Sequence, residues 1–69
     1  MKNRIALLRK ERGLTQQALA ETLKVSRQTV ISLENGRYNP SIRLAYDIAR
    51  VFDCIIEEVF LFEEEEETK

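Results

Sequence analysis

Two short helical patterns separated by a tight break fill residues 15–36 of this 69-residue chain. Leu19 and Leu23 lie one turn apart in the first pattern, and Val30 and Leu33 lie about one turn apart in the second. This spacing places each apolar pair on one face of a helix. The segment therefore predicts two helices that pack their apolar faces against each other and cross closely.

The break and the far end of the segment carry the signals of helix boundaries. Ser26 stands where the second helix needs an N-cap, because a serine hydroxyl accepts a hydrogen bond from a free amide of the first turn. Gly36 stands where that helix ends, and the small Ala20 permits close crossing. Together these features look like a helix-turn-helix, whose second helix enters the major groove of DNA.

Similar signals predict three more short helices, so the expected fold is an all-α bundle of five. Apolar spacing and caps place helices at residues 3–12, 16–23, 27–35, 42–52 and 56–59. Asn3, Thr15 and Ser41 are the expected caps of the first, second and fourth helices, and Gly13 stops the first. Residues 60–62 can form a short edge strand.

The helices are expected to bury the apolar side chains that recur along them. The expected core comprises Ile5, Leu7, Leu8, Leu19, Ala20, Leu23, Val30, Leu33, Ile42, Ala45, Ile48, Ala49, Phe52, Ile56, Val59 and Phe60.

Size and composition exclude several classes of function. Sixty-nine residues make one domain near the lower limit for folding alone, with no room for a deep catalytic cleft. The chain has no histidine, no pair of cysteines and no glycine-rich phosphate loop. We therefore expect no enzyme, no metal, no cofactor and no small-molecule ligand. Because Cys54 is the single cysteine and no bilayer-length apolar run is present, a cytoplasmic protein without a membrane partner is expected.

The net charge of −1 hides two oppositely charged parts. Residues 1–53 carry ten Lys and Arg against five Asp and Glu, whereas residues 54–69 carry seven Glu against one Lys. The pI of about 5.4 therefore does not argue against a nucleic-acid partner, since the charge of one surface is what matters. Two solvated charge patches without a partner are the alternative.

The polar face of the second helix of the pair has the residue types that read bases. Arg27, Gln28 and Ser32 lie opposite Val30 and the apolar face. Arginine can bond guanine O6 and N7, glutamine can bond adenine, and the methyl group of Thr29 can touch a thymine methyl. The alternative is a solvated helix surface with no partner.

Phosphate contacts are expected on both sides of this reading face, because such contacts fix the register of a protein on DNA. Gln16 and Gln17 open the first helix of the pair, where free amides and the helix dipole favour an anion. Asn35, Arg37 and Ser41 follow the second helix.

From LLRKERGLTQ through SRQTVISLENGRYNPS to EEVF, the chain resembles the Cro/cI-type helix-turn-helix family, also called the Xre family. The resemblance implies a five-helix, lambda-repressor-like domain that binds operator DNA as a two-fold dimer. It also implies a buried ion pair between Arg9 and Glu34 that joins the first and third helices. Asp53 and Ile55 depart from the family, which often has Gly and Ser or Thr there. Asp53 must accept the turn, and the side chain of Ile55 cannot cap the fifth helix.

We expect a homodimer on a palindromic operator, because one recognition helix reads few bases. The candidate interface residues are Ile55, Val59, Leu61 and one of Phe60 or Phe62, foremost Phe62. The alternative is that these side chains complete the core of the monomer. We expect residues 1–62 to form the DNA-binding domain and residues 63–69 to form an acidic, disordered tail. The five glutamates of this tail are a solubilising segment, or alternatively repel DNA or protect a strand edge.

These observations favour a sequence-specific transcriptional regulator of double-stranded DNA, most simply a repressor that occludes a promoter. The alternative is an antitoxin or another adaptor that uses the same domain to bind a protein.

Overall fold

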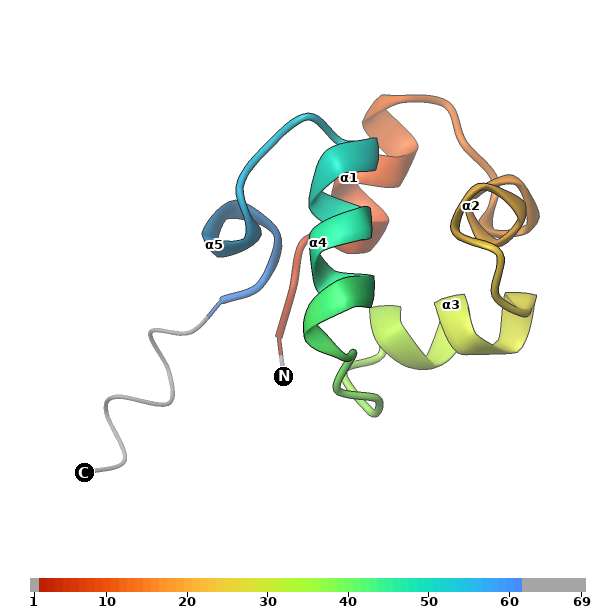
Figure 1. Cartoon of the computed structure of the whole chain (residues 1–69). Coiled ribbons are helices and arrows are strands. Elements are labelled where there is room, and N and C mark those ends of the chain that lie inside the picture. The colour runs from red at the N-terminus through yellow and green to blue at the C-terminus, as the bar shows by residue number, and fades with distance from the viewer. Residues whose placement is uncertain (1, 62–69) are drawn as a thin grey trace.

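A computed structural model describes residues 2–61 and arranges them as a bundle of short α-helices (Figure 1). The helices are α1 (Ile5–Glu11), α2 (Gln16–Leu23), α3 (Arg27–Glu34), α4 (Ile42–Val51) and α5 (Ile56–Val59). The predicted all-α class and the order of elements are confirmed, and each boundary lies within two residues of its predicted place. No helix of residues 2–61 is long and apolar enough to cross a membrane.

Helix α4 lies at the centre of the arrangement. Figure 1 shows the α2–α3 pair on one side of α4 and α5 on the other, with the turn between α2 and α3 at the edge of the molecule. Helices α2 and α3 pack most extensively on each other, and α5 packs on α4. The pair predicted from the sequence is therefore a real structural unit with α4 as its support.

The predicted serine and threonine caps of α2, α3 and α4 are confirmed. The hydroxyl groups of Thr15, Ser26 and Ser41 each accept a hydrogen bond from the backbone N–H three residues further on, at 2.9, 3.1 and 3.1 Å. Each cap satisfies an amide that has no partner within its helix and stabilises the protein by about 1 kcal/mol.

Two non-glycine residues adopt left-handed backbone angles where helices end. Lys24, at the break between α2 and α3, has φ +62°, and Asp53, after α4, has φ +56°. Asp53 thus accepts the turn as expected, since aspartate tolerates this region better than most residues. Lys24 has no such advantage, and its left-handed angle costs about 1–2 kcal/mol.

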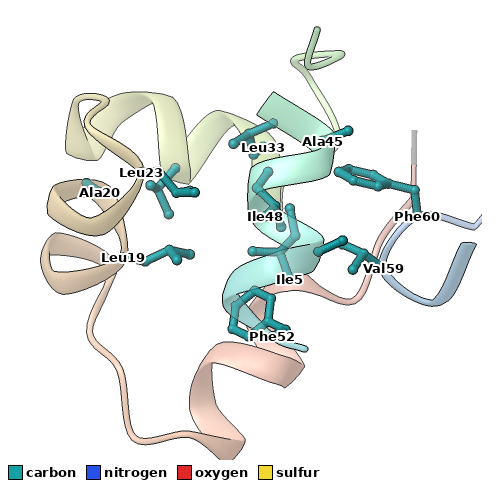
Figure 2. Close-up of a cluster of buried hydrophobic side chains, with 12 residues drawn as sticks. Ile5, Leu19, Ala20, Leu23, Leu33, Ala45, Ile48, Phe52, Val59 and Phe60 are labelled. Atoms are coloured by element: carbon teal, nitrogen blue, oxygen red, sulfur yellow. The ribbon is translucent and has the colours of Figure 1, made fainter. Parts of the chain in front are cut away.

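The core lies between the helices and is formed by one cluster of apolar side chains (Figure 2). Its buried members are Ile5, Leu19, Ala20, Leu23, Val30, Leu33, Ala45, Ile48, Ala49, Phe52, Val59 and Phe60. Leu8 and Ile56 are half-buried and pack against this cluster.

Two expected core residues are exposed instead. Leu7 is 55% exposed, because it lies two positions from Ile5 and therefore on the opposite face of α1. Ile42 is 86% exposed, although its spacing from Ala45 is correct for the buried face. The fully buried face of α4 begins three residues later at Ala45, and the half-buried Leu44 also packs against the core, whereas the side chain of Ile42 lies outside it.

The two ends of the described chain meet in a short antiparallel contact. Asn3 and Phe60 form an isolated β-bridge. The N–H of Arg4 donates to the carbonyl of Val59 at 2.7 Å, and the N–H of Leu61 donates to the carbonyl of Lys2 at 2.9 Å. The edge strand predicted at residues 60–62 is therefore a single bridge in the described residues. Its last residue and the acidic segment 63–69 lie outside them.

Candidate nucleic-acid interface

Helix α3 is held by its apolar face. Val30 and Leu33 are 0% and 1% exposed, and they belong to the same buried cluster as Leu19 and Leu23 of α2. Ala20, which is 0% exposed, is the small residue expected where the two helices approach. This burial fixes α3 as a rigid element, so that its other face is presented in a defined orientation.

The opposite face of α3 carries the expected base-reading residues. Arg27 and Gln28 are exposed, and within residues 2–61 neither side chain has a hydrogen bond or an ion pair. Ser32 is half-buried, as is Thr29. The hydroxyl of Thr29 lies 2.9 Å from the hydroxyl of Ser26 and is engaged in the helix cap, so its methyl group is the part suited to a base contact.

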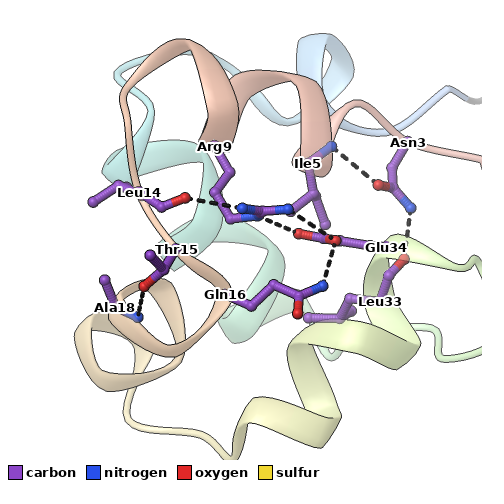
Figure 3. Close-up of polar contacts among 9 residues, drawn as sticks. All are labelled: Asn3, Ile5, Arg9, Leu14, Thr15, Gln16, Ala18, Leu33 and Glu34. Atoms are coloured by element: carbon purple, nitrogen blue, oxygen red, sulfur yellow. Dashed lines mark hydrogen bonds and ion pairs between the residues drawn. The ribbon is translucent and has the colours of Figure 1, made fainter.

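The expected ion pair between α1 and α3 is present (Figure 3). Arg9 Nε lies 2.7 Å from Glu34 Oε2, and Arg9 Nη2 lies 3.4 Å from Oε1. The two side chains are only 11% and 8% exposed. Arg9 Nη1 also donates to the carbonyl of Leu14 at 2.9 Å, which ties the loop before α2 to the same group.

Gln16 joins this network at the start of α2. Its Nε2 donates to Glu34 Oε1 at 3.1 Å, which fixes the amide against the end of α3 (Figure 3). A carboxamide nitrogen carries two hydrogens, so one N–H of Gln16 remains for another acceptor. The bond to Glu34 holds the start of α2 against the end of α3. The phosphate contact predicted for Gln16 stays a prediction.

Asn3 has a role that the sequence reasoning did not find. It is not the N-cap of α1, because Arg4 occupies that position. Asn3 lies one residue earlier, where its Oδ1 still accepts from the N–H of Ile5 at 3.0 Å. Its Nδ2 donates to the carbonyl of Leu33, near the end of α3, at 2.8 Å (Figure 3). Asn3 therefore fastens the N-terminal segment to the end of α3.

The other expected phosphate contacts are all exposed: Gln17, Asn35, Arg37 and Ser41. The amide of Gln17 donates to Glu21 at 3.2 Å within α2. The backbone N–H of Arg37 donates to the carbonyl of Ser32 at 3.0 Å, which anchors the loop to the last turn of α3. Ser41 is also the cap of α4.

The expected dimer residues do not form one exposed surface. Ile55 is 59% exposed and Leu61 is half-buried, so both remain available for an interface. Val59 is 0% exposed, and its assignment to a dimer interface is wrong, because the four-residue α5 turns it into the protomer's own core. Phe62 lies outside the described residues.

Helix α5 has no side-chain cap at Ile55, but the carboxylate of Glu58 supplies the other half of a capping box. Glu58 Oε1 accepts from the N–H of Ile55 at 3.2 Å. Arg12, which the sequence reasoning did not single out, has a similar role at the end of α4. Its Nη2 donates to the carbonyl of Phe52 at 2.7 Å, and its guanidinium lies 6.0 Å from the centroid of the Phe52 ring.

Cys54 is half-buried beside these elements. Burial raises the pKa of its thiol, and the negative charge of Glu58 raises it further. A raised pKa disfavours the thiolate, which is the reactive form. Within residues 2–61, no group of three or more His, Cys, Asp or Glu side chains could hold a metal ion.

Comparison with known proteins places this geometry in a family. The helix-turn-helix family model HTH_3 matches residues 5–59. The chain is 52% identical over 66 residues to an HTH-type transcriptional regulator of Archaeoglobus fulgidus, an alignment that covers 96% of this chain and 94% of the relative. It is 40% identical over 62 residues to the competence pilus inhibition repressor of Acinetobacter baylyi, covering 87% of this chain and 54% of that protein.

A solved structure supports the same assignment. The HTH_3 family transcriptional regulator from Vibrio cholerae superimposes with a TM-score of 0.69 at 26% identity. The match covers 94% of this chain but only 35% of that protein, so the likeness concerns one domain of a longer regulator. The family model, the regulator relatives and the shared fold thus define a transcriptional regulator with a helix-turn-helix domain rather than an enzyme. The chain belongs to the Xre-type helix-turn-helix family.

Proposed function

We propose that this chain is a sequence-specific repressor that reads the major groove of double-stranded DNA with α3. The observation that carries the proposal is the two-sidedness of this helix. Val30 and Leu33 are buried to within 1% of complete burial, whereas Arg27 and Gln28 are exposed and without a partner in residues 2–61. A rigid helix with free guanidinium and carboxamide groups suits the donor and acceptor pattern of the major groove.

Each reading residue has a base that fits its chemistry. Arg27 suits guanine O6 and N7, and Gln28 suits adenine N6 and N7. The hydroxyl of Ser32 can serve either base, and the methyl group of Thr29 suits a thymine methyl. A well-formed bidentate pair discriminates against a wrong base by about 1–3 kcal/mol.

Phosphate contacts frame this reading face in the proposal. The remaining N–H of Gln16 and the amide of Gln17 lie at the start of α2, where the helix dipole favours an anion. Asn35, Arg37 and Ser41 frame the other end of α3. These contacts fix the register of α3 in the groove and carry no sequence information themselves.

The active form in this proposal is a cytoplasmic homodimer on a palindromic operator. Ile55 and Leu61 are the candidate contacts between copies, because Val59 is buried within the protomer. The two recognition helices would lie about 34 Å apart, one turn of DNA. The similarity to a protein named a repressor, which is 40% identical, supports repression by occlusion of a promoter.

Selection of bound sequences from a random pool of duplex DNA tests this proposal. We expect an enriched palindrome, and sedimentation should show a dimer at high micromolar concentration. Replacement of Arg27 by Ala should weaken binding and relax the preference at one base position. Arg37→Ala should weaken binding to all sequences alike and flatten the salt dependence by about one unit. Equal, sequence-independent losses from both variants would show that α3 does not read bases as proposed.

A further inference from the structure

Leu61, the last residue that the structure describes, lies close to the end of α3. Its N–H donates to the carbonyl of Lys2 at 2.9 Å. The residue after Lys2 is Asn3, which bonds the carbonyl of Leu33 in the last turn of α3 at 2.8 Å (Figure 3). The residues that follow Leu61 therefore start next to the C-terminal end of α3.

One hollow is lined both by Leu61 and by the loop that follows α3. Its volume is about 310 Å³, and Asn35 and Gly36 line its loop side. Arg37 is the next residue of this loop, and its backbone N–H donates to the carbonyl of Ser32 at 3.0 Å, which fixes it against α3. The hollow thus connects the position of Leu61 with that of Arg37.

The polar side chains on the loop side of this hollow are exposed and lack partners among the described residues. Asn35 and Arg37 have no side-chain hydrogen bond or ion pair within residues 2–61. The acid nearest to them in sequence, Glu34, is only 8% exposed and is neutralised by Arg9. Residues 35–42 contain no aspartate or glutamate. Arg37 therefore presents a positive charge that no described residue balances.

The chain carries a matching negative charge two positions after Leu61. Residues 63–67 are five consecutive glutamates, which we call the acidic segment. An extended chain advances about 3.3 Å per residue, so these five residues span about 16 Å. Because Arg37 adjoins the hollow that Leu61 lines, the acidic segment can reach it without a change in the described fold. The exposed Glu57 and Glu58 repel the segment from α5.

We propose that the acidic segment lies across this hollow and pairs with Arg37 when DNA is absent, so that it competes with DNA for the same guanidinium. The inference rests on the proposed function, which gives Arg37 a phosphate contact. A guanidinium binds carboxylates and phosphates by the same charge-assisted hydrogen bonds, so one anion excludes the other. Since all duplexes have phosphates, the competition lowers the affinity for every sequence by the same factor.

NMR spectra of the whole chain without DNA test the contact directly. In the comparison variant, all five glutamates of residues 63–67 are replaced by glutamine, which removes the charge and keeps the length. We expect the side-chain Nε–H resonance of Arg37 and the side-chain amide of Asn35 to differ between the two proteins. The difference should not depend on protein concentration, and it should disappear as the salt concentration rises.

Arg50 is the matched control in these spectra. It is another exposed arginine, and its guanidinium lies 5.8 Å from the centroid of the Tyr46 ring on α4. An unchanged resonance for Arg37, or an equal change for Arg50, would overturn the inference. A change that grows with protein concentration would assign the acidic segment to a second copy of the chain and would also overturn it.

Affinity for duplex DNA tests the competition. We expect the glutamine variant to bind random duplexes and the selected operator about three- to tenfold more tightly at low salt, the effect of one or two exposed ion pairs. This gain should largely disappear in an Arg37→Ala background and persist in an Arg50→Ala background. Equal gains in both backgrounds would indicate general repulsion between the acidic segment and DNA, and would overturn the inference. Thermal unfolding shows whether each variant is folded.

Arg27→Ala separates this inference from the proposed function. If Arg27→Ala relaxes base preference while the glutamine variant leaves the Arg37 resonance unchanged, the inference fails alone. If Arg27→Ala leaves base preference intact, the proposed function fails. The comparison of spectra requires no DNA, so it still decides in that case whether the acidic segment contacts Arg37.

Discussion

Replacing Glu34 with glutamine should remove much of the stability of this domain. The change keeps the shape of the side chain but removes the charge that faces Arg9, whose side chain is 11% exposed. It also turns one acceptor oxygen into an NH2 group, although both oxygens of Glu34 accept hydrogen bonds, from Arg9 and Gln16. A buried arginine without its counter-charge and a donor facing a donor both destabilise the folded state.

The expected loss is about 3–5 kcal/mol in the free energy of unfolding, the usual effect of breaking a buried pair. Marginal stability of about 0.05–0.15 kcal/mol per residue gives about 3–10 kcal/mol for a chain of this size. The variant should therefore be near or beyond the limit of folding at 25 °C. Denaturant unfolding followed by circular dichroism measures the loss.

Two further variants decide whether the buried charge is the cause. Glu11→Gln removes an exposed carboxylate from α1 and should change the free energy of unfolding by less than about 0.5 kcal/mol. Arg9→Met combined with Glu34→Leu removes both charges and should restore most of the stability. A loss below about 1 kcal/mol for Glu34→Gln would refute the reasoning, because the pair would then behave as an exposed one.

Three other predictions concern single residues elsewhere. Lys24→Gly should raise the free energy of unfolding by up to about 1 kcal/mol in the same denaturant assay. Glycine relieves a left-handed backbone strain of about 1–2 kcal/mol, but it costs about 0.4–1 kcal/mol in conformational entropy. A loss of stability would contradict this. Asn3→Asp keeps the acceptor for Ile5 but removes the donor to Leu33. Operator affinity measured by titration should therefore fall clearly, whereas the denaturant midpoint of unfolding should fall only slightly. Because its pKa is raised, Cys54 should be alkylated more slowly at neutral pH than the same thiol in the unfolded chain, and the rate should rise as the pH increases; equal rates would contradict this.

Local signals predicted most of the fold. Thr15, Ser26 and Ser41 cap helices through contacts that span only three residues, so the sequence contains both partners at a fixed spacing. The burial of Val30 and Leu33 follows from the helical period. Such features depend on neighbouring residues alone, which is why they can be read without a structure.

Contacts between distant residues could not be predicted in this way. Asn3 bonds Leu33 across 30 positions, and Arg12 bonds Phe52 across 40. No spacing rule connects such pairs, because their approach depends on how whole helices pack. The ion pair of Arg9 with Glu34 was anticipated only through the family resemblance.

Periodicity also failed where a helix extends past the core. Ile42 has the spacing of a buried residue, but its side chain lies outside the core and is 86% exposed. Val59 was expected both in the core and between two copies, and the short α5 directs it into the core of the protomer. In both cases the pattern identifies a helical face correctly, but the extent of the core decides what covers it.

Methylation interference on the selected operator tests the central claim that α3 reads the major groove. Methyl groups on guanine N7 lie in the major groove, whereas those on adenine N3 lie in the minor groove. We predict that guanine methylation at symmetric operator positions blocks binding, and that Arg27→Ala becomes insensitive to methylation at one guanine in each half-site. Interference confined to adenine N3, or an identical pattern for Arg27→Ala, would contradict the account.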